Sequence, residues 1–528
     1  MTTPRRFVIG VAVAITASGL ALYPPALVAA DEALHYPRVA AEVPVTATDL
    51  PGAVGNNSPQ LARDPTNRRF MVLANRRDAP RYGCALQVSG DGGASWVTAS
   101  PVPKLPAGAA TCYAPEVAFD RRGRIYYLFV GLAGPGNTPI GVYLTISSDR
   151  ARTFSPPRKL LGPQRFGVRM AIDQGQGTRG RIHLAWLEAR SALPLGGFGP
   201  TPNPIMASFS DDGGSRFSAP VQVSDPARAR VVAPALALGE DHRVHVGYYD
   251  LGSDVRDYQG LEGPAWEGDW SLVVSTSSDG GRSFGRGSVV DAGIVPPERV
   301  LLIYTMPPAA LAAGPSGRVY AAWHDGRNGD WDVFVRRSDD AGRTWSKPTR
   351  VNDDPKGDQR HQYLPRLAVA PDGRLDVIFY DRRRDRTNRG VDVSYAFSSD
   401  HGAHFSTNIR VSVINFDSQI GQQYAVPSAQ GRHEFGARLA LLSDDHQAVG
   451  AWTDTRNTER ITGTGRVAQD IYAAVIDVKG PTSGGSSGGS GPVVMPLVGV
   501  GALAAATMVA GRRRVRRRAS TSRPASEA

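Results

Sequence analysis

One eight-residue pattern occurs six times in this chain, beginning at residues 89, 147, 210, 277, 338 and 398. It reads SGDGGASW in the first copy and SSDGGRSF in the fourth, with the consensus S-x-D-x-G-x-[ST]-[WF]. Ser and Asp side chains can hydrogen-bond the backbone of their own turn, Gly accepts a left-handed conformation, and the aromatic ring covers the turn. Each copy therefore predicts the turn of a β-hairpin. The second copy has Ala151 in place of the Gly, where we expect modest backbone strain.

Each octet lies inside a longer unit, which recurs at intervals of about sixty residues. Every unit contains an alternating strand, a tight turn of Asp, Gly and Arg, a strand that ends on an aromatic residue, a variable loop, a third strand and the octet. The matching stretches are 58–77, 114–131, 169–190, 233–250, 306–327, 364–383 and 435–456. Four short antiparallel strands repeated in this way are typical of propeller blades. The sequence predicts an all-β, seven-bladed β-propeller over residues 38–479, with six blades as the alternative.

The seventh unit ends at Ile471–Ile476 without an octet or a fourth strand. The segment Val43–Thr48 resembles a fourth strand and can complete that blade, which would close the ring and remove exposed sheet edges. With the octets on one face, the loops between second and third strands and the connections between units emerge on the opposite face. These loops vary in length, and we expect the site among them.

The two ends of the chain predict where the protein resides. Residues 1–30 have a charged start, a short apolar run and a small-residue exit, as a cleaved signal peptide has. Residues 480–491 form a Gly/Ser linker, and the uncharged residues 492–510 would reach about 28 Å as a helix, close to the thickness of a bilayer core. The basic segment 511–528 would stay in the cytoplasm. We expect a single-pass cell-membrane protein with an extracellular propeller and a cytoplasmic C-terminus.

The net charge of +11 arises mostly from these ends. Without nine arginines and one glutamate of the signal peptide and tail, the remaining chain holds 51 basic and 48 acidic residues, a net charge of +3. The basic balance thus gives no reason to expect nucleic-acid binding. Cys84 and Cys112 are the only cysteines and predict one disulfide in an oxidising exterior. They are too few for a zinc site, and we expect neither metal nor cofactor.

The octet is the Asp box, and the chain resembles the Asp-box (BNR-repeat) propellers, the superfamily that includes the sialidases. The resemblance spans nearly all of residues 40–478. Sialidases use a Tyr nucleophile assisted by a Glu, an Asp acid/base and three Arg that hold the substrate carboxylate. On this resemblance the candidate catalytic residues are Tyr304, Tyr363, Glu298 and Asp325. The R-[IL]-P motif of the first sialidase Arg does not occur in this sequence, and the corresponding stretch reads NNSPQLA.

Candidate ligand-binding residues come from two features on the loop face. The first is an aromatic-x-Asp-x-Arg pattern at the end of three second strands, whose charged members are Asp325, Arg327, Asp381, Arg383, Asp454 and Arg456. Arginine forks of this kind clamp carboxylates, but they also form ion pairs between blades. Repetition around the ring favours ion pairs, because a catalytic site should be asymmetric. The second feature is the long loop 250–270, in which Trp266 and Trp270 could stack on a sugar.

Two functions remain open from the sequence. The propeller could recognise an extracellular glycan or protein at its loop face, or it could hydrolyse glycans as an exo-sialidase or another glycoside hydrolase. The residues favour recognition, whereas the resemblance favours hydrolysis.

Overall fold

The computed structural model describes most of the chain between residues 37 and 479. The described residues are 37–49, 55–78, 81–100, 103–175, 180–191, 197–239, 242–261, 266–296, 307–418, 435–457 and 469–479. The predicted signal peptide, linker, membrane span and tail lie outside them. Within the described ranges, every helix is too short or too polar to span a bilayer.

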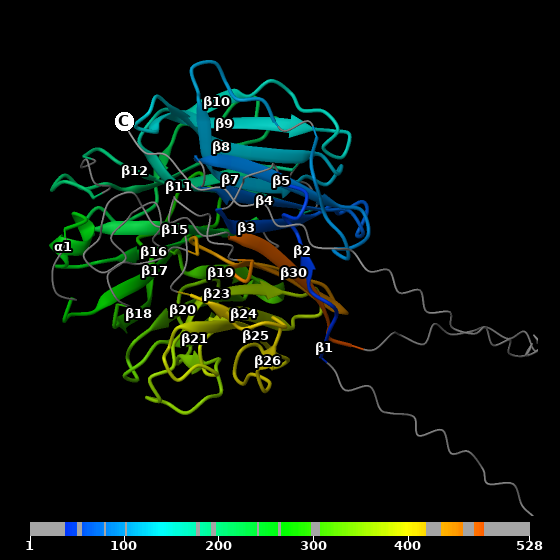
Figure 1. Ribbon diagram of the computed structural model, residues 1–528. Helices are drawn as coiled ribbons and strands as arrows, with labels where there is room; N and C mark the ends of the chain where they lie inside the picture. The colour runs from blue at the N-terminus through cyan, green and yellow to red at the C-terminus, as the bar shows by residue number, and fades with distance from the viewer. Residues whose placement is uncertain are drawn as a thin grey trace, which may run out of the picture. The chain divides into compact units, whose positions relative to one another are not determined.

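The described strands form seven antiparallel sheets, which we number as blades 1 to 7 in chain order (Figure 1). Blade 1 contains β3 (Asn56–Arg63), β4 (Met71–Arg77), β5 (Gly83–Ser89) and β6 (Val97–Thr98). Blade 2 contains β7 (Thr111–Phe119), β8 (Ile125–Ala133), β9 (Thr138–Ser147) and β10 (Arg158–Leu161). Blade 3 contains β11 (Arg165–Ile172), β12 (Ile182–Glu188), β13 (Ile205–Ser210) and β14 (Val221–Gln222).

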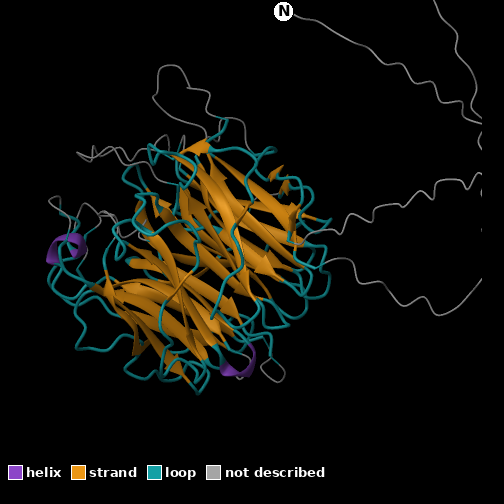
Figure 2. Cartoon of the chain, turned by 90° about the horizontal axis from the view of Figure 1, so that it is seen from below, coloured by secondary structure: helices purple, strands orange, loops and turns teal. Residues whose placement is uncertain are grey.

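Blades 4 to 6 repeat the same plan. Blade 4 contains β15 (Val231–Leu238), β16 (Val244–Asp250), β17 (Trp270–Ser277) and β18 (Ser288–Ile294). Blade 5 contains β19 (Ala310–Ala313), β20 (Val319–Asp325), β21 (Asp332–Ser338) and β22 (Thr349–Arg350). Blade 6 contains β23 (Gln362–Val369), β24 (Leu375–Asp381), β25 (Gly390–Ser398) and β26 (Ile409–Arg410), and β27 (Phe416–Asp417) also pairs with β25. Helical structure is confined to α1 (Val255–Tyr258) and one 3₁₀ turn (Pro315–Gly317) among the described residues, both at the periphery (Figure 2).

Blade 7 joins the two ends of the propeller. Its strands are β28 (Ala440–Ser443), β29 (Gln447–Asp454) and β30 (Asp470–Asp477), and β30 also pairs with the N-terminal strands β1 (Arg38–Val39) and β2 (Val43–Pro44). Val43 lies opposite Ala473 in this pairing. The first strands contact one another in the order β3, β7, β11, β15, β19, β23, β28 and again β3. The ring of seven blades and its closure by the N-terminal segment are therefore confirmed, and the closing segment already begins at Arg38.

The core lies between neighbouring blades. The second strand of each blade is covered on both sides, and in β24 every residue is buried. The tryptophans of three second strands, Trp186, Trp323 and Trp452, are fully buried. Burial of such large apolar side chains between the sheets is the main stabilisation of the ring.

The octets occupy the turns between third and fourth strands, as predicted. In the fourth copy, Ser277 Oγ donates to Asp279 Oδ1 over 2.7 Å and accepts from the backbone N–H of Gly281 over 2.8 Å. Burial would raise the pKa of Asp279, but hydrogen bonds, first from Ser283 and then from Ser277, lower it to about 2. In the second copy Ala151 has a φ of 65°, which is the strained left-handed conformation expected there. The octet stabilises its own blade.

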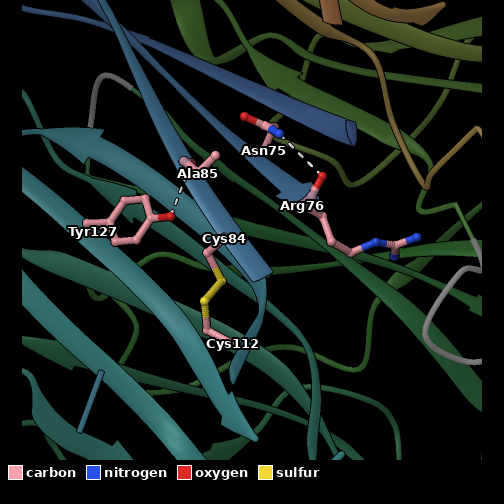
Figure 3. Close-up of a disulfide and its surroundings, with 6 residues drawn as sticks. All are labelled: Asn75, Arg76, Cys84, Ala85, Cys112 and Tyr127. Atoms are coloured by element: carbon pink, nitrogen blue, oxygen red, sulfur yellow. Dashed lines mark hydrogen bonds between the residues drawn. A yellow bond between two sulfur atoms is a disulfide. The ribbon is translucent and has the colours of Figure 1, made fainter. Parts of the chain in front are cut away.

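A disulfide joins Cys84 of β5 to Cys112 of β7, with their Cα atoms 5.7 Å apart (Figure 3). It links the third strand of blade 1 to the first strand of blade 2. Close by, the hydroxyl of Tyr127 donates to the carbonyl oxygen of Ala85 over 3.2 Å, so that a hydrogen bond also joins the two blades. The predicted disulfide is confirmed.

Candidate functional site

The innermost strands share a local irregularity that turns side chains towards the propeller axis. Six residues near the start of these strands have positive φ, namely Ser58, Ala114, Gly167, Ala233, Leu364 and Gly436. At the first five of them the pairing with the second strand shifts register, as at a β-bulge. Bulges re-aim the side chains that follow them.

The residue two positions after each of these six lines a cavity of about 80 Å³, and Pro308 lines it from blade 5. Each of the seven blades thus contributes at least one lining residue, and the equivalent positions are, in chain order, Gln60, Glu116, Arg169, Ala235, Pro308, Arg366 and Arg438. Because every first strand reaches the cavity, it lies on the axis of the ring. We call it the axial cavity. Its wall is asymmetric, since three arginines and one glutamate stand among neutral residues.

Glu116 ties three blades together at the axial cavity. Its Oε1 accepts a hydrogen bond from Arg169 Nη1 over 3.0 Å, and Arg438 Nη1 donates to the same oxygen. Its Oε2 lies 3.3 Å from the backbone N–H of Met170. The Glu116 side chain is 3% exposed. Burial would raise its pKa, but the charges of Arg438 and then Arg169 outweigh burial, and the pKa of Glu116 is lowered. This carboxylate is therefore ionised at neutral pH.

Arg366 differs from the other two arginines of the cavity. Its backbone pairs with Ile378 in the sheet, but its side chain makes no ion pair or hydrogen bond with any residue that the structure describes. Burial, and after it the charge of Arg438, lower the pKa of Arg366 to about 10, at which the guanidinium still carries its charge at neutral pH. Three arginines against one glutamate leave the axial cavity with a net charge of +2. A cavity of this kind attracts an anion and has no protonated acid to offer.

The predicted Asp-x-Arg residues lie on the loop face, in three separate local ion pairs. Arg327 Nη2 lies 2.6 Å from Asp325 Oδ2 and 3.1 Å from Asp291 Oδ1 of blade 4. Arg383 Nε lies 2.6 Å from Asp381 Oδ2, and this arginine also pairs with Asp353.

The third of these arginines has the same double pairing. Arg456 Nη2 lies 2.6 Å from Asp454 Oδ2, and its guanidinium also pairs with Glu42, which lies between β1 and β2. In all three cases the arginine bridges its own second strand to a carboxylate from another segment. The geometry favours the interpretation as ion pairs that hold the ring, and a role of these six residues in ligand binding stays a prediction.

Burial explains the arrangement of these pairs. Asp325 and Asp381 are fully buried, and Asp454 is 1% exposed. The indole N–H of Trp323 donates to Asp325 over 2.7 Å, so the aromatic residue of the pattern also satisfies the carboxylate. Burial raises the pKa of Asp325 although Arg327 opposes this. A buried carboxylate needs hydrogen-bonding and charged partners. This need alone explains why an aromatic residue and an arginine accompany each aspartate of the pattern.

The other predicted residues are dispersed. Trp270 is 5% exposed at the start of β17, and its indole N–H donates to Asp254 over 3.0 Å. Trp266 is half-buried against the core of blades 3 to 5. Tyr363 is 7% exposed on β23, beneath the guanidinium of Arg382 at 4.9 Å. Tyr304 and Glu298 lie outside the described residues. Their catalytic and sugar-stacking roles stay predictions.

The axial residues were missed by sequence reasoning. A signal for them exists, because the repeat units align as SPQ, APE, GVR, APA, LPR and GAR around the bulge, and the last column carries the charges. The matching stretch of the third repeat unit is 169–190, which begins at Arg169. Gly167 and the bulge therefore lie outside the aligned part of that unit.

A model of a known protein family matches part of the chain. Residues 317–476 match the family model of the BNR repeat-like domain. No curated protein matches this sequence. Seven antiparallel sheets of four or five strands, six of them with an Asp-box turn, define a β-propeller of the Asp-box class. The resemblance to the BNR-repeat, sialidase-like propellers is thus supported by the fold, and the family match itself covers residues 317–476.

Solved structures with similar architecture are distant in sequence. The endosialidase of phage phi92 shares 12% identity, with a TM-score of 0.45, over 86% of this chain and 71% of that chain. A mutant α-L-arabinofuranosidase from Fusarium graminearum shares 12% identity, with a TM-score of 0.43, over 83% and 98% of the two chains. A PL25 ulvan lyase shares 12% identity, with a TM-score of 0.47, over 82% and 95%. At this distance a match says nothing about activity.

Proposed function

We propose that this protein is an exported, membrane-anchored propeller that recognises an extracellular glycan or protein ligand bearing an acidic group, and that it does not turn the ligand over. The observation that carries the proposal is the axial cavity, in which three arginines face the single carboxylate of Glu116 and the Arg366 side chain makes no ion pair with the described residues. Guanidinium groups bind carboxylates and sulfates through paired hydrogen bonds, which suits recognition of an acidic ligand.

The chemistry of the cavity argues against general acid catalysis by its own residues. Most glycoside hydrolases use a pair of carboxyl groups, and sialidases use a Tyr nucleophile with an Asp acid/base. In both cases the general acid is a carboxyl group that must be protonated at the working pH. Glu116 is the one carboxyl group lining the axial cavity among the described residues, and its pKa is lowered by Arg438 and Arg169 despite burial. Glu116 therefore cannot donate a proton at neutral pH. Breaking its ion pairs with Arg169 and Arg438 would also cost free energy. Recognition therefore accounts for the described residues better than hydrolysis.

Membrane anchoring and export complete the proposal and rest on the sequence. The signal peptide 1–30 would direct the propeller outside, and the span 492–510 would hold it at the surface beyond the linker 480–491. The linker lets the loop face reach ligands that are not attached to the same membrane.

The experiment uses the soluble fragment 31–480, which contains every described strand. The fragment is tested on a panel of acidic and neutral glycans for binding, and on a fluorogenic sialoside for turnover. The proposal expects saturable binding of acidic members and no turnover. Release of the fluorophore at a rate that depends on Tyr363 would support the hydrolase instead. The Asp325→Asn variant serves as a second arm, because the ion-pair interpretation expects a lower melting temperature, whereas loss of binding at unchanged melting temperature would assign Asp325 to the ligand.

A further inference from the structure

The octet turns and the turns between first and second strands lie on one face of the ring, which we call the octet face. We propose that the octet face docks, through blades 1 and 2, on the anionic headgroups of the bilayer that anchors the protein. Docking in this orientation presents the loop face to the exterior. The inference rests on the membrane anchor of the proposed function and adds a second surface, opposite the one that recognises the ligand.

The first argument is the place where the chain leaves the propeller. β30 pairs with β29 and ends beside the turn between β28 and β29. Beyond the strand, the backbone N–H of Val478 donates to the carbonyl oxygen of His446 in that turn over 2.8 Å. Lys479 pairs with Asp372, which lies in the turn between the first and second strands of blade 6. The last described residue is therefore held at the octet face.

The second argument is the length of the predicted linker. A Gly/Ser chain of the size of residues 480–491 has an average end-to-end distance of about 20 Å. β30 has eight residues and spans about 26 Å from the loop face to the octet face. To turn the loop face towards the bilayer, the linker would have to pass along the whole blade. The tether therefore favours the octet face as the side near the headgroups.

The third argument is a basic patch that blades 1 and 2 form on the octet face. The patch comprises six exposed arginines of the turns, namely Arg68, Arg69, Arg121, Arg122, Arg150 and Arg152. None of these six side chains forms an ion pair with a residue in the described ranges. Together with Arg124, which pairs with Asp120, the turns of the two blades hold seven arginines against four aspartates, a net charge of +3.

The turns that carry the basic patch lie against one another. The guanidinium carbon of Arg150 in blade 2 lies 5.7 Å from the centre of the Phe70 ring in blade 1. A Cβ atom on Gly123 of blade 2 would lie only 2.9 Å from Asp64 Oδ1 and 3.0 Å from Thr66 Oγ1 of blade 1. The six arginines therefore form one continuous surface across the two blades.

The other side of the octet face has the opposite charge. The corresponding turns of blades 6 and 7 hold Asp372, Asp400, Asp444 and Asp445 against Arg374, a net charge of −3. Lipid phosphates accept paired hydrogen bonds from guanidinium groups, and a negatively charged bilayer attracts arginines that come within a Debye length of about 10 Å. The same bilayer repels the acidic turns. Contact is therefore expected through blades 1 and 2 and not through the whole octet face.

Energy transfer in nanodiscs tests the orientation. The full-length protein is placed in discs of neutral phosphatidylcholine, or in discs in which about a third of the lipid is phosphatidylglycerol, with an acceptor dye on the headgroups. The donor dye is attached through Gly90→Cys in the first octet or through Gly136→Cys in the loop between β8 and β9. Both glycines are exposed, and a Cβ atom would meet no other atom closer than 3.9 Å at either position. We expect stronger transfer from position 90 than from position 136, with a larger difference in anionic discs that about 0.5 M salt removes.

Charge variants test the patch itself. Arg122→Gln with Arg152→Gln removes two charges from it, and each should lower the ratio of docked to undocked protein on anionic discs about fivefold. Arg286→Gln with Arg343→Gln is the matched control, because both arginines are exposed on the octet face of blades 4 and 5 and form no ion pair within the described part of the chain. The control should dock as the wild type does. Equal losses in the two double variants, transfer that is the same in neutral and anionic discs, or stronger transfer from position 136 would overturn the inference.

Flotation with vesicles distinguishes this inference from the proposed function. Full-length protein that floats with neutral vesicles is anchored by its span. If the wild type floats with anionic vesicles alone and R122Q/R152Q floats with neither kind, the anchor fails and the docking stands. If neither kind of vesicle carries the wild type, both fail. Ligand recognition is tested separately, because the patch lies opposite the loop face and the R122Q/R152Q protein should bind acidic glycans as the wild type does.

Discussion

Arg169 Nη1 lies 3.0 Å from Glu116 Oε1, and this ion pair joins the first strands of blades 2 and 3 at the axis of the ring. The same oxygen also accepts from Arg438 of blade 7. One buried carboxylate thus links blades 2, 3 and 7 at the axis, which is formed by the first strands. The pair distinguishes the axial cavity from the Asp-x-Arg pattern of the loop face, in which Arg327, Arg383 and Arg456 each pair with at least two carboxylates. At the axis two arginines share one carboxylate, and a third has none among the residues that the structure describes.

Glu116 is predicted to be a major stabilising residue. Replacing it by Gln should lower the free energy of unfolding by about 3–5 kcal/mol, since breaking a buried ion pair leaves its partners uncompensated. Urea unfolding measures the change. The control is Glu188→Gln, because Glu188 lies 3.5 Å from Arg165 with both side chains about a quarter exposed, and its loss should cost less than about 1 kcal/mol. Equal losses in the two variants would contradict the assignment.

The disulfide is predicted to stabilise the junction of blades 1 and 2. Its cysteines are separated by 28 residues along the chain. Closing a loop of this length reduces the entropy of the unfolded state, which corresponds to about 3–4 kcal/mol. The double variant Cys84→Ser with Cys112→Ser should unfold at lower urea concentration by that amount, and the wild type should show no free thiol under denaturing conditions. Two titratable thiols in the wild type would refute the bond.

In the fourth octet, the buried first serine, Ser277, is predicted to contribute more to stability than the exposed Ser283. Ser277→Ala leaves the buried backbone N–H of Gly281 without its acceptor, which should cost about 1–3 kcal/mol. Ser283→Ala is the matched control, because the exposed Ser283 hydroxyl only donates to Asp279 and water can replace it. Thermal unfolding of both variants tests the difference. A larger loss in S283A would show that the hydrogen bond to Gly281 does not hold the turn.

The contribution of two buried histidines to stability is predicted to fall as the pH falls from 7.5 to 5. Burial, and then the charge of His361, lower the pKa of His324 to about 4, and burial, then Arg382, lower the pKa of His361 to about 4. Free histidine titrates near pH 6.5, so between these values the unfolded chain binds protons that the folded chain does not. Each histidine's contribution is therefore complete above pH 6.5 and is lost towards pH 4.

The test compares unfolding free energies at pH 7.5 and pH 5 in three proteins. His361→Gln should show a smaller difference between the two pH values than the wild type. His446→Gln is the control and should behave as the wild type, because the His446 side chain is exposed and makes no ion pair with the described residues. Asp454, whose pKa burial raises to about 7, titrates in all three proteins and cancels from the comparison. An unchanged difference in H361Q would exclude the histidine as its source.

The repeats made the architecture predictable, and the same property concealed the axial cavity. The octets predict hairpins because their side chains bond locally, and Val43–Thr48 is recognisable as a strand because it completes a pattern. The axial positions bear Gln, Glu, Arg, Ala, Pro, Arg and Arg, which share no side-chain chemistry. Comparison of the repeat units finds positions that carry the same residue type in every unit. It does not find the axial positions, because their residue types differ from blade to blade.

Tertiary packing also could not be predicted from the sequence. The sequence places Trp270 in a loop, whereas in the structure it begins β17 and its indole N–H donates to Asp254 in the core. The side-chain partner that decides such a case lies 16 residues away and is brought close by α1 and its flanking turns. By contrast, Arg327 and Asp325 are two residues apart, and their local ion pair could be expected from the pattern.

The central claim is that the axial cavity binds the acidic group of a ligand. Selenate tests it most directly, because selenium scatters anomalously and the ion resembles the sulfate group of an acidic ligand. Crystals of the protein grown with selenate should show an anomalous peak in the cavity within hydrogen-bond distance of Arg366, and crystals of R366M should lack it. A cavity without a peak in the wild type, at selenate concentrations that populate other sites on the same molecule, would contradict the account.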